Sequence, residues 1–65
     1  MSELHERIRS ERERLRMTQA DLADALSVHW NTVARWERGE LGFHPAQRRE
    51  IIRWLRMAEK RKEEA

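Results

Sequence analysis

The feature that most constrains the fold is the placement of glycine and proline. Both glycines and the single proline of this 65-residue chain lie between residues 39 and 45. These residue types are the strongest local interrupters of regular structure. The rest of the chain is rich in Ala, Leu, Glu, Arg, Gln and Met, which favour helix, and poor in β-branched residues. We therefore predict an all-α fold, a compact bundle of four helices with room for a short fifth turn.

Local signals set the expected helix boundaries. The first helix is predicted over residues 2–15. The second starts after Thr18, a favourable N-cap, with Asp21 placed to reach back in a variant of the capping box. The third is predicted over His29–Arg38, because Gly39 suits the position after a helix end, and the fourth runs from Pro45 to about Lys62. We expect one domain at residues 1–62 and a frayed tail at residues 63–65.

Composition removes several classes of function. The chain has no cysteine, which excludes disulfides and thiolate metal sites. No nucleophile and base pair stands out, so we expect no enzyme, no cofactor and no small-molecule ligand. No apolar run approaches the roughly 20 residues that span a bilayer, and the N-terminus lacks a hydrophobic export segment, so we expect a soluble cytoplasmic protein without a membrane partner. The three histidines lie far apart and lack metal-ligand spacing: His5, His29 and His44.

Charge limits how a nucleic-acid partner would be recognised. Fourteen Lys and Arg against 12 Asp and Glu give a formal net charge of only +2. Any nucleic-acid footprint must therefore come from where the charges are placed rather than from their total.

A helical wheel divides residues 29–38 into two arcs. The arc predicted to face inward contains Thr32, Val33, Trp36 and Glu37. The arc predicted to face outward contains Asn31, Ala34, Arg35 and Arg38. Arginine can donate two hydrogen bonds to guanine, asparagine can pair with adenine, and a small residue admits close approach to the groove. An ordinary solvated face is the alternative interpretation.

A turn of about three residues joins the second and third helices, and this spacing is typical of the motif that inserts its second helix into the major groove. The stretch MTQADLADALSVHWNTVARWERGEL, Met17 to Leu41, resembles the lambda-repressor-like, or Xre, helix-turn-helix family. Its Thr-Gln start, Leu-Ala in the second helix, Val in the turn and Trp-Glu-Arg-Gly end are specific. The match covers roughly residues 7–41, about half of the chain.

The resemblance implies sequence-specific binding of double-stranded DNA, with His29–Arg38 as the recognition helix. The residues it places at the bases are Trp30, Asn31, Thr32, Ala34 and Arg35. Those it places at the DNA backbone are Thr18, Gln19, His29 and Arg38. It also matches Arg12 and Glu37 to a buried ion pair, and the helical pattern independently places Arg12 on an apolar stripe, where it requires a partner.

The sequence departs from the family pattern at three positions. Ser27 stands in the turn where glycine is usual, and Glu40 stands where a phosphate-binding lysine is frequent. Trp30 is unusual at a base-reading position, so contact with a thymine methyl and packing onto the core of the protein are both open.

The fourth helix carries an apolar arc of about 160°, wider than the roughly 100° that covers one core. We therefore predict a homodimer whose interface contains Ile51, Trp54, Leu55 and Ala58. The alternative is a small core that wraps this helix on two sides. As a function we predict a small transcriptional regulator that represses from a palindromic operator. The alternative is a protein-binding module of the same fold, antitoxin-like or polymerase-associated.

Overall fold

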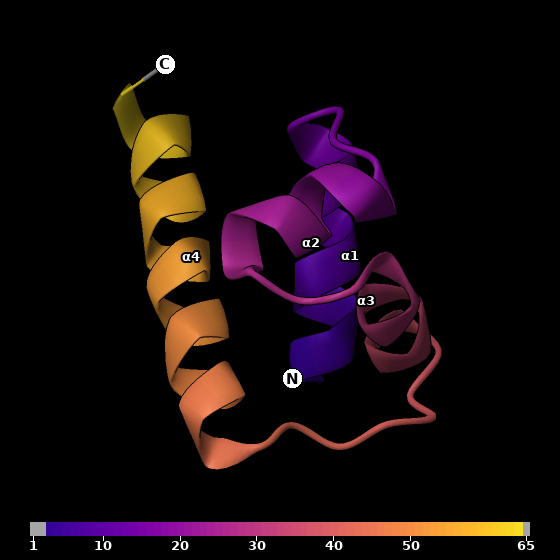
Figure 1. Cartoon of the computed structure of the whole chain (residues 1–65). Coiled ribbons are helices and arrows are strands. Elements are labelled where there is room, and N and C mark those ends of the chain that lie inside the picture. Colours follow the sequence, from indigo (N-terminus) through magenta and orange to yellow (C-terminus); the bar gives the residue numbers. More distant parts are fainter. Residues whose placement is uncertain (1–2, 65) are drawn as a thin grey trace.

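The computed structural model describes residues 3–64, with side chains described as far as residue 60. Within that range it contains four helices and no strand (Figure 1): α1 (Leu4–Arg14), α2 (Gln19–Leu26), α3 (Trp30–Glu37) and α4 (Pro45–Glu64). The all-α prediction is confirmed, and the described residues contain no fifth helix. Because α4 continues to Glu64, the tail expected from residue 63 is helical up to that point. The expected helical residue Ser2 and the end of that tail, Ala65, lie outside the described residues.

The start of α2 follows from local hydrogen bonding. The Thr18 hydroxyl accepts from the Asp21 N–H at 3.0 Å, and the Asp21 carboxylate accepts from the Thr18 N–H at 2.9 Å. This reciprocal capping box satisfies two backbone groups that the first helical turn leaves unpaired. The predicted N-cap is therefore confirmed.

The turn between α2 and α3 contains a left-handed residue. Ser27 has φ 57° and ψ 43°, and the next N–H, that of Val28, donates to the carbonyl of Ala23 at 2.9 Å. Serine thus adopts the conformation for which glycine is usual, which places its Cβ close to its own carbonyl oxygen. Gly39 closes α3 with φ 74°, as predicted for a helix end.

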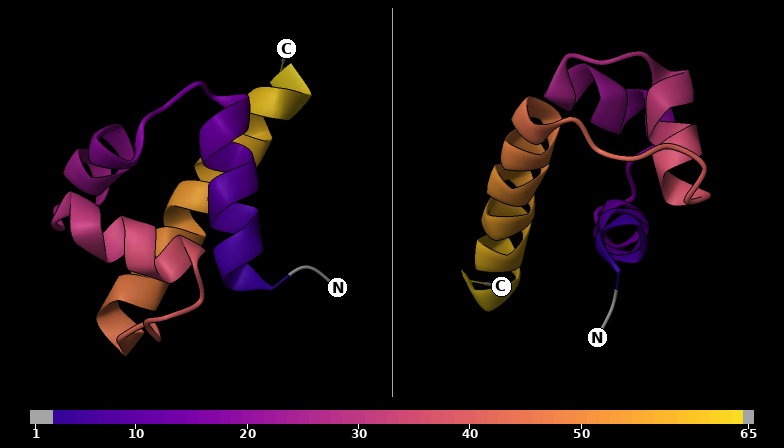
Figure 2. Two further views of the ribbon diagram at one scale, coloured as in Figure 1. Left: turned by 90° about the vertical axis from the view of Figure 1, so that its right-hand side faces the viewer. Right: turned by 90° about the horizontal axis from the view of Figure 1, so that it is seen from below.

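The helices are arranged with α3 and α4 on opposite sides of the molecule. Figure 1 shows α4 at one edge and α3 at the other, and the view from below in Figure 2 shows the same separation with α1 between them. α2 packs mainly against α3, and α1 packs against both α3 and α4. The core between them consists of Ile8, Leu22, Ala23, Val33, Trp36, Ile51 and Leu55.

The prediction that Ile51, Leu55 and Ala58 lie at a dimer interface is wrong. Ile51 and Leu55 are 1% exposed and Ala58 is 3% exposed within a single chain, so these side chains have no free surface to offer a second subunit. Trp54 is half-buried and packs against the same core. The wide apolar arc therefore reflects the alternative considered above, a small core that contacts α4 over more than one side.

Candidate nucleic-acid interface

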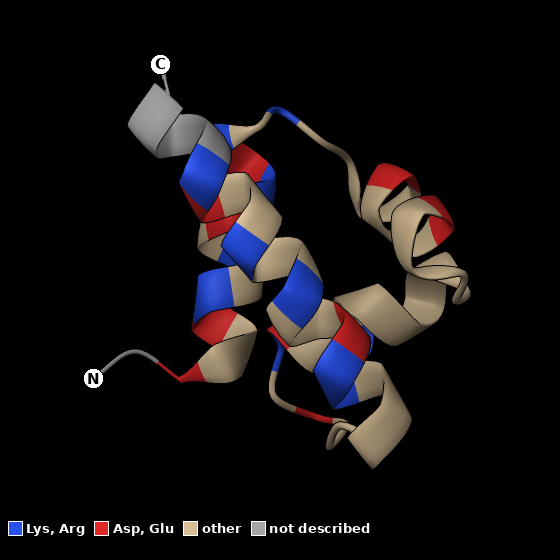
Figure 3. Ribbon diagram, turned by 90° about the vertical axis from the view of Figure 1, so that its left-hand side faces the viewer, with Lys and Arg blue, Asp and Glu red and all other residues tan. Residues whose placement is uncertain are grey.

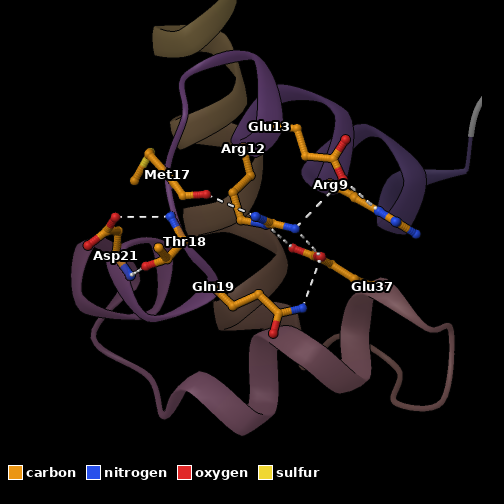
Figure 4. A network of polar contacts seen from close by, with 8 residues as sticks. All are labelled: Arg9, Arg12, Glu13, Met17, Thr18, Gln19, Asp21 and Glu37. Atoms are coloured by element: carbon orange, nitrogen blue, oxygen red, sulfur yellow. Dashed lines mark hydrogen bonds and ion pairs between the residues drawn. The ribbon is translucent and has the colours of Figure 1, made fainter.

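A buried ion pair fixes α3 to the rest of the domain (Figure 4). Arg12 Nε donates to Glu37 Oε2 at 2.7 Å and Arg12 Nη2 donates to Glu37 Oε1 at 2.9 Å. The Arg12 side chain is 13% exposed and that of Glu37 is 4% exposed. A guanidinium and a carboxylate that meet through two parallel hydrogen bonds are held in distance and in orientation. The structure therefore brings together the two charged residues that the sequence pairs.

The same pair extends to α2 and to the loop before it. Arg12 Nη1 donates to the carbonyl oxygen of Met17 at 2.9 Å, and Gln19 Nε2 donates to Glu37 Oε1 at 3.2 Å. The hydrogen bond to Glu37 raises the pKa of Arg12, so the pair favours the charged form that an arginine already keeps in proteins. Three segments, α1, the start of α2 and the end of α3, thus converge on one carboxylate (Figure 4).

The outward face of α3 is exposed where the wheel predicts. Asn31, Arg35 and Arg38 are exposed, and Thr32 is half-buried. Trp30 is 53% exposed, so it is not part of the core. The structure therefore excludes packing of Trp30 into the core, and contact with a thymine methyl stays a prediction.

Ala34 is placed differently from the prediction. Its side chain is buried at 4% exposure, whereas the wheel assigns it to the outward arc. α3 packs against both α1 and α2, so its buried arc is wider than the single inward side that the wheel assumes. Ala34 is therefore removed from the set of base-contacting residues.

The residues predicted to meet the DNA backbone surround the two ends of α3 and the start of α2. Thr18 and His29 are exposed N-caps, and Gln19 is half-buried. The Nδ1 atom of His29 accepts from the Asn31 N–H at 3.1 Å. In the neutral ring this leaves the proton on Nε2, which is free to donate. Its ring lies 5.7 Å from that of Trp30, centroid to centroid, so the two aromatic side chains lie side by side at the start of α3.

Glu40 modifies this surface in a way the sequence analysis did not anticipate. Its carboxylate lies 3.0 Å from Arg38 Nη2, and both side chains are more than half exposed. The sequence indicated this contact only through the placement of Arg38 and Glu40, two opposite charges two residues apart just after the predicted end of the third helix. In the free protein Arg38 is therefore paired with Glu40, and a DNA phosphate would have to compete with this carboxylate for it.

A family model described as helix-turn-helix, of the Xre or lambda-repressor type, matches residues 8–45, which is more than half of the chain. The chain belongs to this family. The matched helix-turn-helix contains α2, the left-handed turn and α3, together with most of α1. Searches of curated proteins and of solved structures found no significant match.

Membership in the helix-turn-helix family makes DNA the partner and regulation of transcription the broad role. The family is typically non-enzymatic. Among the described residues no group of three or more His, Cys, Asp or Glu side chains is placed to hold a metal ion. No helix in the described part of the chain combines the length and apolarity needed to cross a membrane.

Proposed function

We propose that the protein binds a specific double-stranded DNA sequence by inserting α3 into the major groove. The observation that carries this proposal is the pairing of a firmly held inner face with a polar outer face on one short helix. Val33 and Trp36 are fully buried, and Glu37 is tied to Arg12. Asn31 and Arg35 face outward. A helix that reads base edges needs a fixed inner face and a polar outer face, because its hydrogen-bond donors must be held at defined positions relative to the bases.

The exposed residues divide into two proposed roles. Trp30, Asn31 and Arg35 are proposed to meet bases, with half-buried Thr32 at the edge of the contact. Thr18, Gln19, His29 and Arg38 are proposed to meet phosphates. Gln19 also donates to Glu37, so a phosphate contact through its remaining amide hydrogen would link the DNA backbone to the network that holds α3.

A two-fold dimer on a palindromic operator is part of the proposal, because two recognition helices about 34 Å apart read successive major grooves on one face of the duplex. The proposed dimer surface keeps Trp54 from the interface predicted from the sequence and replaces the buried residues Ile51, Leu55 and Ala58 by more exposed neighbours. Partly exposed apolar side chains from α2, α4 and the segment between α1 and α2 surround a hollow of about 230 Å³. Those side chains are Leu15, Met17, Ala25, Trp54 and Met57, the last of which is 57% exposed.

Repression is the proposed outcome of binding, because a dimer seated across two half-sites occupies surface that another DNA-binding protein would need. A reporter gene placed behind the selected operator should fall in expression when the protein is produced. A rise in expression would contradict this part of the proposal and leave the DNA-binding part intact.

The main experiment is selection of bound duplexes from a random pool. We expect an enriched sequence made of two inverted half-sites with centres about one helical turn apart. Failure to enrich any sequence at low salt would refute sequence-specific binding. Enrichment of a single half-site would refute the palindrome while keeping the reading role of α3.

Two arginine variants separate base contacts from phosphate contacts. Arg35→Ala should relax the preference at one position of each half-site and cost about 1–3 kcal/mol of binding free energy on the selected site. Arg38→Ala should weaken binding to all duplexes alike and reduce the salt dependence by about one unit of slope. Arg49→Ala, which removes an exposed arginine from α4 instead, is the matched control and should leave both quantities unchanged.

The dimer is tested separately. Met57→Glu should convert the protein to a monomer in sedimentation equilibrium and weaken binding to the full palindrome more than binding to one half-site. If the unaltered protein sediments as a monomer on and off the operator, the two-fold arrangement is wrong.

A further inference from the structure

A groove on the outer side of α4 combines positive charge with an apolar floor. The hollow has a volume of about 510 Å³, within the range of about 300–1,000 Å³ typical of ligand sites. Phe43 and Ile52, both half-buried, supply its apolar surface. Its rim consists of Arg48, Arg49, Arg53 and Arg56, all exposed.

These four arginines differ from those of α1 in having no charged partner. Arg7 pairs with Glu59, Arg9 with Glu13, Arg12 with Glu37 and Arg14 with Glu11. None of the four groove arginines forms an ion pair with any described residue. They place four positive charges on one surface of a chain whose formal net charge is +2.

The arginine rim of the groove lies on α4, away from the proposed DNA-reading helix, whereas Phe43 of its floor packs against Trp36 of α3 with ring centroids 5.3 Å apart. Figure 3, which views the molecule from the side on which α4 lies, shows basic residues repeated along the outer face of this helix. α3 lies on the far side of the molecule, beyond α1 (Figures 1 and 2). The α4 rim and the outward face of α3 are therefore separate surfaces, and the experiments below test whether DNA uses the rim.

We propose that the groove binds an acidic segment of a partner protein, with an apolar side chain of that segment seated on Phe43 and Ile52. Charge complementarity selects an anionic partner. The rim spans residues 48–56 of one helix, about 12 Å at 1.5 Å per residue, so a single phosphate or carboxylate cannot meet all four arginines. Nucleic acid would satisfy the arginines and leave the apolar floor against a polar backbone. An acidic peptide with an apolar anchor fits both features.

The proposal does not depend on DNA binding and is tested without DNA. The probe is a fluorescein-labelled synthetic peptide of about three helical turns, in which glutamates flank a central pair of leucines. Fluorescence anisotropy with the full chain should show saturable binding that weakens as salt is raised. Two control peptides carry serine in place of the leucines or glutamine in place of the glutamates, and both should bind more weakly.

Two variants of equal charge change test the place of binding. Arg53→Glu, on the groove rim, should weaken binding of the glutamate-leucine peptide by about tenfold or more, because an attractive charge becomes repulsive. Lys60→Glu reverses an exposed charge on the same helix one turn beyond the groove and should weaken binding clearly less than Arg53→Glu, because Lys60 is not part of the rim. Circular dichroism spectra of the two variants should match that of the unaltered protein, since both side chains are exposed.

Three results would overturn the proposal. The first is equal weakening by Arg53→Glu and Lys60→Glu, which would reduce the interaction to overall charge. The second is equal affinity of the serine and leucine peptides, which would remove the role of the apolar floor. The third is a loss of duplex binding in Arg53→Glu as large as the loss of peptide binding, which would assign the groove to DNA phosphates.

Discussion

Replacing Glu37 by glutamine tests whether the buried ion pair holds the recognition helix in place. The carboxylate accepts two hydrogen bonds from Arg12, at 2.7 and 2.9 Å, and one from Gln19 at 3.2 Å. In Glu37→Gln one of these oxygens becomes an amide NH2 group that faces other donors. The charge of Arg12 then remains in a site where its side chain is only 13% exposed.

The cost follows from that unpaired charge. Removing one partner of a fully buried ion pair costs about 3–5 kcal/mol. Arg12 retains slight access to solvent and its hydrogen bond to the Met17 carbonyl, so we expect a loss of about 2–3 kcal/mol in the free energy of unfolding. A domain of this length has about 3–10 kcal/mol in total. The variant should therefore lose a large share of its stability.

Urea unfolding followed by circular dichroism measures this loss, with two comparison variants. Arg9→Gln breaks an ion pair of similar length, 2.9 Å to Glu13, whose side chains are 64% and 55% exposed. Its effect should be much smaller than that of Glu37→Gln. The double variant Arg12→Met/Glu37→Leu leaves no charge unpaired and should be more stable than Glu37→Gln alone. The reasoning is refuted if Glu37→Gln and Arg9→Gln lose equal stability, or if the double variant is no more stable than the single one.

Three further predictions concern the turn and the DNA surface. Ser27→Gly should raise the free energy of unfolding by about 0.5–1 kcal/mol in a thermal melt, because glycine tolerates the left-handed conformation at φ 57°; an unchanged or lower melting temperature would contradict this. Glu40→Gln should release Arg38 from its 3.0 Å contact and tighten DNA binding in fluorescence anisotropy, because Arg38 then meets its phosphate without first leaving a carboxylate; an equal gain when Arg38 is replaced by alanine as well would show that the effect does not act through Arg38. Uracil lacks the methyl group of thymine, so replacing the half-site thymines by uracil should lower the DNA affinity of the unaltered protein and leave the affinity of the Trp30→Ala variant unchanged. Equal losses of affinity in the two proteins would exclude Trp30 as the residue that contacts the methyl group.

The helix boundaries were predictable because their causes are local. Thr18 and Asp21 form their capping box within one turn, and Gly39 adopts the left-handed backbone that its lack of a Cβ permits. The ion pair of Arg12 with Glu37 joins residues far apart in sequence. It was predictable because an arginine on an apolar stripe needs a partner and the family resemblance supplied one.

The predictions for Ala34 and for the inner face of α4 were wrong because the burial of these side chains depends on how many other helices each helix contacts. A wheel gives the direction of Ala34 and of Ile51, Leu55 and Ala58, and it gives the width of an apolar arc. It does not distinguish a second contact within the domain from a contact with a second subunit. In this fold α3 packs on both α1 and α2, and the inner face of α4 is used up by one core.

Because α4 contacts the rest of the domain with its inner face, its outer face remains exposed. Its buried positions are all apolar, so the charged residues of the helix are displaced to the outer side. There Arg48, Arg49, Arg53 and Arg56 lie beside two apolar side chains of the groove. None of them forms an ion pair with a carboxylate among the described side chains, unlike Arg7 and Arg9 of α1. Packing against the core does not require these four arginines, and like charges placed close together around an apolar hollow repel one another. An acidic partner would neutralise these charges, and this expectation for α4 does not depend on what α3 reads.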